Sequence, residues 1–310
     1  MKRVVSVSLG ASSRNKAVEV EMAGVPIRIE RQGTDGDFER AVSLIRSLSG
    51  KVDCIGLGGL DRYLAAGDRR WELRQAAQMV RAAGPTPVVD GSGFKKWVEP
   101  AVLRTLSERG ELQINGAKVL MVSGVDRYGM AEAFWQMGAD VICGDLMFAL
   151  GIPIPVRSLR LLNVLACVLL PFLRLAPIQM LYPTGEKQEA SSPRFEKYFL
   201  WADIIAGDFH FIRRHLPEAL AGKTIVTNTT TEQDVELLRE RGVARLVTTT
   251  PVMEGRSFGT NVLEACLVAT SGKGPEKLSE RDYIWFMEAL GWQPAARNLG
   301  SPPGAARTGG

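Results

Sequence analysis

The stretch Ile114–Asp145 constrains the fold of this chain more than any other. Its apolar run Lys118–Ser123 is too short for a helix and is typical of a strand buried on both faces. After a glycine turn, apolar residues recur at helical spacing until Gly138, and a second short strand over 141–143 leads to Asp145. This order of strand, turn, helix, strand and acid predicts a parallel sheet.

At the N-terminus of such a helix, free backbone N–H groups and the positive end of the helix dipole point toward the carboxyl end of the preceding strand. A phosphate binds well at this position. Asp145 lies about 20 residues after Gly124, where these units place the carboxylate that binds an adenosine ribose. The alternative is a β-α-β unit with a structural role only, because Asp126, Arg127 and Tyr128 lie in the turn where a dinucleotide fingerprint has a second small residue. From this turn and from the polar ends of later strands we predict the following cofactor contacts: Gly124, Asp126, Arg127, Gly129, Met130, Asp145, Asn228 and Thr249.

The composition indicates a globular protein with a large core. The chain has 310 residues, of which 45% are hydrophobic and 23% charged, and its formal net charge of +4 is spread without a block of lysine and arginine. We therefore expect no nucleic-acid partner. The cysteines lie far apart in apolar runs, which fits neither a zinc site nor a disulfide framework. We expect no metal and a cytoplasmic location, and we interpret the N-terminus as a strand rather than a signal peptide.

Strands and helices alternate along the chain. This pattern predicts an α/β fold with two α/β domains, of which the second is a Rossmann-like, mostly parallel sheet with a helical apolar insertion. We expect the following division: an N-terminal substrate domain over 1–92, a crossing helix over 93–112, a nucleotide-binding domain over 113–272 with an insertion at 146–190, a C-terminal helix over 273–292 and a disordered tail over 293–310.

The segment Leu146–Tyr182 is unusually apolar. Its longest uncharged run is shorter than the roughly 20 residues that a bilayer span requires, and prolines interrupt it. We interpret the segment as a buried or subunit-contact helical insertion, and we expect a homodimer without membrane contact. A lid over an apolar ligand and a monotopic membrane contact are the alternatives.

Polar residues at other strand ends are further candidates. His210 and Arg213 follow a strand and could hold a carboxylate or phosphate and move a proton. The alternative for this segment is a helix start with a capping aspartate and a solvated basic face. Arg256, in a glycine-rich loop, is an anion candidate, and Ser6 and Ser8 in the first strand are substrate candidates.

Three strings carry a family resemblance: V-D-G-S-G-F at 89–94, I-N-G-A-K-V-L at 114–120 and G-V-D-R-Y-G-M-A-E-A at 124–133. In order and spacing they resemble the shikimate/quinate 5-dehydrogenase family, where a T-D-G-x-G-F turn leads through a helix and an N-G-K-K-V-L strand into a glycine loop. The resemblance implies an oxidoreductase that moves hydride between a nicotinamide and the alcohol carbon of a cyclic polyol acid, in a cleft between two domains.

The resemblance also implies catalytic residues. Asp90 matches the family's aspartate, which works beside a lysine in proton transfer. The family takes that lysine from an upstream N-V-T-x-P-x-K segment, whereas residues 53–74 contain no lysine here, so Lys95 is the candidate and a solvated helix residue is the alternative. His210 is a second acid/base candidate.

Two functions follow from this sequence. The first is an NAD(P)-dependent dehydrogenase of the quinate/shikimate type, with NAD favoured over NADP because the carboxylate of Asp145 would repel a 2′-phosphate. The second is a non-catalytic sensor that binds a nucleotide or small anion on the same two-domain frame.

Overall fold

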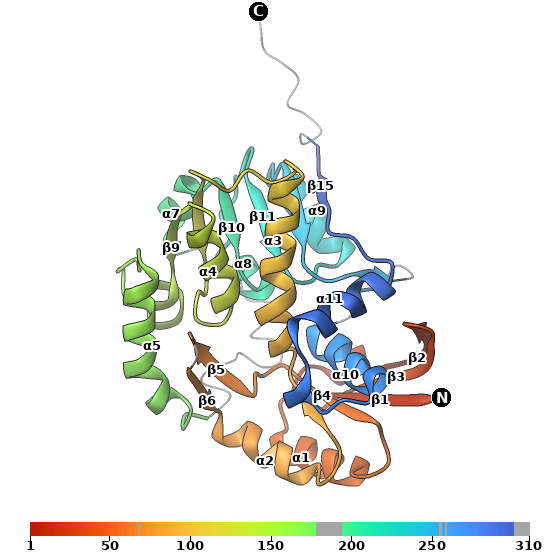
Figure 1. The fold of residues 1–310 in the computed structure, drawn as a ribbon. Helices are drawn as coiled ribbons and strands as arrows, with labels where there is room; N and C mark the ends of the chain where they lie inside the picture. The colour runs from red at the N-terminus through yellow and green to blue at the C-terminus, as the bar shows by residue number, and fades with distance from the viewer. Residues whose placement is uncertain (68, 178–193, 254–255, 258, 301–310) are drawn as a thin grey trace, which may run out of the picture. The chain divides into compact units, whose positions relative to one another are not determined.

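The computed structural model describes residues 1–67, 69–177, 194–253, 256–257 and 259–300. The chain has an α/β fold, as expected, and it forms two compact units (Figure 1). Unit 1 comprises Met1–Glu99, Asn163–Ala190 and Phe258–Gln293, and unit 2 comprises Pro100–Leu162, Ser191–Ser257 and Pro294–Gly310.

Unit 1 is built on a five-stranded sheet in the order β2-β3-β1-β4-β7. Its strands are β1 (Lys2–Ser8), β2 (Lys16–Met22), β3 (Val25–Gly33), β4 (Cys54–Gly58) and β7 (Val88–Val89). β2 and β3 form an antiparallel hairpin, as the alternating runs on either side of Ala23 and Gly24 predict, and both turn residues have positive φ. The other neighbours pair in parallel, so the carboxyl ends of β1, β3, β4 and β7 lie at one edge of the sheet.

Helices cover both faces of this sheet. The helical elements of unit 1 are η1 (Ser12–Arg14), α1 (Phe38–Leu48), α2 (Arg74–Ala82), the π-helical turn η2 (Phe94–Val98), α10 (Thr260–Ser271), η5 (Pro275–Lys277) and α11 (Glu280–Ala289). In Figure 1, β1 and β4 lie between α10 on one side and α1 and α2 on the other. The carboxylate of Asp37 caps α1, whose apolar face packs with Leu57 and Met79 in the core of the unit.

A short hairpin precedes α2. It consists of β5 (Tyr63–Ala66) and β6 (Arg69–Glu72), which pair antiparallel. The sequence predicts a helix over 69–83, and this prediction is wrong for its first turn, because residues 69–72 are the second strand of the hairpin and the helix begins at Arg74.

Unit 2 is built on a six-stranded sheet in the order β15-β12-β11-β10-β8-β9. Its strands are β8 (Lys118–Met121), β9 (Asp140–Cys143), β10 (Ile204–Ala206), β11 (Thr224–Thr227), β12 (Arg245–Thr248) and β15 (Ala296–Asn298). The first five are parallel, so the strand order in this unit reverses between β8 and β10. β13 (Val252–Met253) and β14 (Arg256–Ser257) form a separate antiparallel pair.

The helical elements of unit 2 connect these strands. They are α3 (Glu99–Glu108), which begins at the boundary between the units, α4 (Tyr128–Gln136), the π-helical turn η3 (Asp145–Ala149), α7 (Glu196–Trp201), α8 (Phe209–His215) and α9 (Glu232–Glu240). The boundary also falls within α5 (Leu159–Leu173), which forms the described part of the predicted insertion. Residues 178–193 of that insertion lie outside the described residues.

Several boundaries differ from those expected. Unit 1 extends to Glu99 instead of 92, and it includes the described residues 163–177 of the insertion that was expected in the second domain. Residues 258–272 belong to unit 1, because α10 packs against β4 so closely that a Cβ at Gly56 would lie 2.8 Å from the carbonyl oxygen of Asn261. The expectation of a disordered tail from 293 is wrong for 296–298, since β15 pairs antiparallel with β12 and Leu299 is buried. Residues 301–310 of the expected tail lie outside the described part.

Candidate functional site

The turn after β8 meets the acid at the end of β9. The carboxylate of Asp145 accepts hydrogen bonds from the backbone N–H groups of Gly124 at 3.0 Å and Val125 at 2.9 Å. Burial raises the pKa of Asp145, although these two bonds oppose the shift. A Cβ at Gly124 would lie 2.5 Å from Cys143 Sγ, so glycine permits this close approach. The acid and the glycine turn are therefore brought together.

Arg127 stands where the strand order of unit 2 reverses. Its side chain is 1% exposed, its Nη2 donates to Asp208 Oδ2 at 3.1 Å, and its Nε lies 3.5 Å from Asp126 Oδ2. Asn228 donates from its amide to the same oxygen of Asp208 at 3.0 Å. Since this point of an open α/β sheet is where ligands bind, a buried guanidinium between two carboxylates occupies the expected ligand position.

The remaining predicted cofactor contacts are dispersed. Gly129 and Met130 lie in the first turn of α4, and the Met130 side chain is fully buried in the core. Thr249 is buried after β12, and its hydroxyl has no hydrogen-bond partner among the described residues. Arg256 lies in β14, and its side chain is outside the described part of the structure.

His210 and Arg213 both lie on α8, and their hydrogen bonds go to different partners. His210 is exposed, and its backbone N–H donates to the carboxylate of Asp208, which caps the helix. Arg213 donates to Asp234 Oδ1 of α9 at 3.0 Å, so its guanidinium joins two helices. Of the alternative interpretation of this segment, the helix start with a capping aspartate is confirmed, whereas the solvated basic face is not, because Arg213 pairs with Asp234 and His215 is buried.

A second group of polar residues lies in unit 1, around the turn that follows β7. Asp90 is 6% exposed and accepts hydrogen bonds from the backbone N–H groups of Arg62 at 2.5 Å and Ser92 at 3.0 Å. The loop after β4 therefore contacts the loop after β7 through this carboxylate. Both loops leave the carboxyl edge of the sheet, which is the usual position of a site in a parallel sheet.

Glu264 of α10 is buried beneath the same turn. Its carboxylate accepts hydrogen bonds from the N–H groups of Gly91 at 2.7 Å and Gly93 at 3.0 Å, and from the Tyr283 hydroxyl at 2.5 Å. Burial, followed by the charge of Asp90, raises the pKa of Glu264 to about 7. Burial and the neighbouring Glu264 also raise the pKa of Tyr283. This part of unit 1 can therefore bind or release a proton near neutral pH.

Lys95 completes the group. Its Nζ lies 2.7 Å from Asp61 Oδ1, and the two side chains are 15% and 12% exposed. Lys95 is thus no solvated helix residue. Because the residue after Asp61 donates to Asp90, the ion pair and the catalytic candidate belong to one network. We refer to Asp61, Asp90, Lys95, Glu264 and Tyr283 as the Asp90 cluster.

The two candidate serines of β1 are buried and bonded. Ser6 Oγ accepts a hydrogen bond from Asn261 Nδ2 at 2.9 Å, and Ser8 Oγ accepts one from Arg31 Nη2 at 3.1 Å. Ser8 and Arg31 lie at the same sheet edge as the loops of the Asp90 cluster, because β1 and β3 are parallel to β4.

Sequence reasoning did not identify Glu264, Tyr283 or Asp61. Glu264 could have been found from the sequence, since it is the one charged residue in the apolar run 262–269. A carboxylate buried in such a run needs hydrogen-bond or charge partners. Asp61 follows a buried strand and two glycines, which is the same kind of signal. In the described part of the chain, no group of three or more His, Cys, Asp or Glu side chains is arranged to hold a metal ion.

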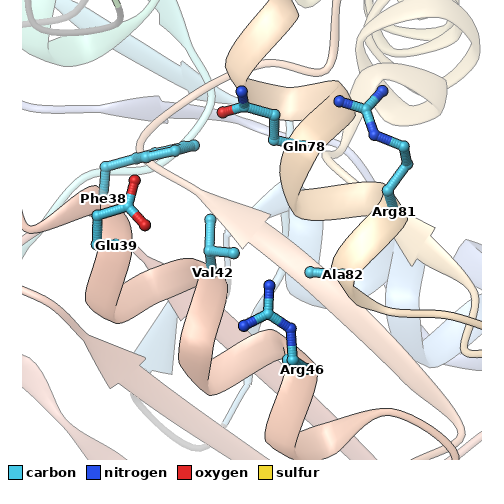
Figure 2. Close-up of a pocket in the computed structure, with 7 residues that line it drawn as sticks. All are labelled: Phe38, Glu39, Val42, Arg46, Gln78, Arg81 and Ala82. Atoms are coloured by element: carbon cyan, nitrogen blue, oxygen red, sulfur yellow. The ribbon is translucent and has the colours of Figure 1, made fainter.

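A surface groove of about 580 Å³ lies between α1 and α2 of unit 1 (Figure 2). Phe38, Glu39, Val42 and Arg46 line it from α1, and Gln78, Arg81 and Ala82 line it from α2. None of these residues belongs to the Asp90 cluster, so the groove is separate from the chemistry described above.

Comparison with solved structures finds enzymes and binding proteins. The chain resembles a putative malic enzyme (malate oxidoreductase) at 15% identity and a TM-score of 0.38, covering 93% of this chain and 84% of that chain. It resembles an NAD-dependent malic enzyme from Thermotoga maritima at 14% identity and a TM-score of 0.37, covering 93% and 83%. It also resembles the periplasmic binding protein of the arabinose ABC transporter from Shewanella sp. ANA-3, at 11% identity and a TM-score of 0.36, covering 93% of this chain and 95% of that chain. All three TM-scores are below 0.5, so these likenesses establish no function.

No curated protein matches the chain in sequence. Two family descriptions do match. Residues 3–90 match a domain of unknown function, DUF8753. Residues 93–299, more than half of the chain, match a second domain of unknown function, DUF8754, and the chain therefore belongs to the DUF8754 family.

Proposed function

We propose that this chain is an NAD(P)-dependent oxidoreductase of the quinate/shikimate type, in which unit 1 holds the polyol acid and unit 2 holds the cofactor. The observation that carries the proposal is the largely buried Lys95–Asp61 ion pair, joined to Asp90 through the backbone of Arg62. A lysine and an aspartate in proton transfer are what the family resemblance implies for Asp90. Here the lysine comes from the helical turn after β7 instead of an upstream segment.

Oxidation of an alcohol carbon requires a group that takes the hydroxyl proton and a group that stabilises the oxygen. A carboxylate of the Asp90 cluster can accept the proton, and the Lys95 ammonium can donate a hydrogen bond to the oxygen as the carbonyl forms. In the reverse direction the protonated carboxyl group returns the proton to the oxygen, and the ammonium again donates a hydrogen bond to it. Bound NAD would supply the hydride acceptor.

Asp145 of unit 2 could bind the ribose of a nucleotide, but its hydrogen bonds occupy amides that a pyrophosphate would need. Each oxygen of Asp145 accepts one amide hydrogen bond and keeps a lone pair for a ribose hydroxyl. The same two bonds occupy the Gly124 and Val125 amides, so those groups cannot also hold a pyrophosphate. Arg127 is the alternative phosphate ligand, because a phosphate can replace the Asp208 carboxylate on its guanidinium.

Binding and turnover test this proposal separately. NAD and NADP are titrated while tryptophan fluorescence is followed, and quinate or shikimate oxidation is followed by the absorbance of the reduced cofactor. We expect Lys95→Met and Asp90→Asn to lower kcat by about 10²-fold or more with little change in the affinity for NAD. Lys96→Met is the matched control, because Lys96 is exposed and lies over the Trp97 ring. Absence of binding of both cofactors at millimolar concentration contradicts the proposal.

The second candidate is a non-catalytic sensor of a nucleotide or small anion. The buried Arg127 between Asp126 and Asp208 favours it, since an anion that displaced a carboxylate there would alter the contacts of α8. Asp90→Asn separates the two functions. If the chain is a sensor, the wild type and Asp90→Asn bind the ligand equally well and neither shows turnover. If it is a dehydrogenase, the wild type turns over substrate and Asp90→Asn does not.

A further inference from the structure

The exposed side of α5 carries a row of apolar side chains. Five side chains are 43% to 73% exposed and follow one another at spacings of three and four residues: Leu161, Val164, Val168 and Phe172 in the helix, and Leu175 just after its end. We call these residues the α5 stripe. The opposite side of the helix buries Leu162, Ala166 and Leu170. One side of α5 therefore packs against the protein, while the other presents large apolar groups to the surroundings.

Arginines flank the stripe at both ends. Arg157 and Arg160 are exposed at the start of α5, and Arg174 is exposed at its end. Nη1 of Arg157 lies 3.7 Å from Asp140 Oδ1, and both of these side chains are about half exposed, so the ion pair is weak. Residues 146–185 contain no aspartate or glutamate. The charge of this segment is therefore entirely positive.

Two more arginines of unit 1 lie against the helix. Nη1 of Arg69 is 3.6 Å from Cys167 Sγ, and the backbone N–H of Arg74 donates to the carbonyl of Arg174 at 3.0 Å. Both side chains are exposed. They extend the positive surface beside the α5 stripe.

We propose that the α5 stripe binds the interface of a membrane that contains anionic lipids. A helix with one apolar face and basic flanks lies in the plane of the interface, with its apolar side chains at the boundary of headgroups and acyl chains and its arginines at the lipid phosphates. Such a contact does not cross the bilayer. None of the helices in the described residues is long and apolar enough to do so.

A second copy of the chain fits the stripe less well. An antiparallel contact between two α5 helices places Arg160 opposite Arg174 of the other copy, and a parallel contact places each arginine near its own counterpart. With no acid in this segment, either arrangement brings like charges together. Anionic headgroups complement the same charges.

Vesicle flotation of the full chain tests the proposal. We expect binding to vesicles of phosphatidylcholine mixed with phosphatidylglycerol, weaker binding in high salt and little binding to phosphatidylcholine alone. Replacing two stripe residues in Val168→Asp/Phe172→Asp should weaken binding roughly tenfold or more. Arg160→Gln/Arg174→Gln should weaken it by about fivefold per arginine, and it leaves the apolar residues unchanged. The matched control is Trp285→Ser, which removes an exposed aromatic of α11 away from the stripe.

Three results overturn the proposal: a wild-type chain that does not float with anionic vesicles, stripe variants that bind as tightly as Trp285→Ser, and binding that is insensitive to the arginine changes. Light scattering supplies a fourth test. A wild-type dimer that Val168→Asp/Phe172→Asp converts to a monomer would assign the face to a second copy instead. Circular dichroism shows whether each variant is folded, and the arginine variant tests the proposal even if the aspartate variant is not.

Discussion

Glu264 should make the stability of the chain depend on pH near neutrality. Burial, followed by the charge of Asp90, raises the pKa of its carboxyl from 4.5 to about 7. A group with a higher pKa in the folded chain binds its proton more tightly when the chain is folded. Its contribution to stability is complete below about pH 4.5, the unfolded value, and is lost as the pH rises through about 7.

The size of this effect follows from the pKa change. A difference of about 2.5 in pKa corresponds to about 3 kcal/mol in the free energy of unfolding, of which about 2.5 kcal/mol is lost between about pH 5 and about pH 8. Glu264→Gln removes the titrating group and keeps the shape of the side chain. The difference in stability between the wild type and this variant should therefore shrink by about 2.5 kcal/mol over that range, whatever constant cost the lost hydrogen bond to Gly91 or Gly93 adds.

Urea unfolding, followed by tryptophan fluorescence in steps across this pH range, measures the difference. Glu288→Gln is the control, because Glu288 is exposed on α11 and lies outside the Asp90 cluster. Tyr283→Phe removes a donor that lowers the pKa of Glu264, so it should move the loss of stability to higher pH. A difference between the wild type and Glu264→Gln that stays constant or grows with pH would show that the three hydrogen bonds keep the carboxylate ionised.

Three further changes test the packing around the candidate sites. Gly93→Ala should destabilise the chain by about 2 kcal/mol in thermal unfolding, because its Cβ would overlap the Tyr283 hydroxyl. Arg127→Met should cost about 3 kcal/mol in urea unfolding, since it leaves Asp126 and Asp208 without the buried guanidinium, and adding Asp208→Asn should restore part of the loss. Thr231→Val should cost about 1 kcal/mol in the same assay, because Thr231 and Asp234 form the capping box of α9.

The local parts of the fold were predictable from the sequence. The strand predicted over 118–123 contains β8 (Lys118–Met121), Gly138 follows the end of α4 with a positive φ, and Asp145 follows β9. The hairpin of β2 and β3 was also predictable, because Gly24 follows Ala23 between two alternating runs. Each of these features depends on residues that are neighbours in sequence, where apolar period and glycine placement decide the conformation.

The composition of the candidate site was not predictable, because its contacts join distant segments. Glu264 meets Gly91 across 173 residues, and a periodic pattern contains no information on that pairing. The same reason explains β15, which becomes a strand only because β12 offers it an unpaired edge. The strand predicted over 201–206 is correct from 204, but Trp201 ends α7, which packs on the core of unit 2 through Phe199.

If the chain is the dehydrogenase proposed above, the charges of the Asp90 cluster restrict how a polyol acid can bind to unit 1. The buried carboxylates of Asp61 and Asp90 exceed the single ammonium of Lys95, so they would repel a substrate carboxylate and attract the hydrogens of its hydroxyl groups. The acid end of the substrate needs a cation elsewhere. We propose Arg31 for this role in such a dehydrogenase, because its guanidinium lies at the end of β1, where it donates to Ser8 Oγ and to the carbonyl of Ala11.

We therefore expect Arg31→Gln to raise KM for quinate or shikimate by about tenfold and to leave KM for the methyl ester of the same acid unchanged, since a charged hydrogen bond to a carboxylate contributes about 1.5–3 kcal/mol. Steady-state kinetics with both substrates measures the difference. Arg28→Gln is the control, because Arg28 lies on the same strand and pairs with Glu19 and Glu30. An equal rise in KM for acid and ester would show that Arg31 acts only by stabilising the structure of β1 and β3, because a loss of structure does not distinguish a carboxylate from its ester.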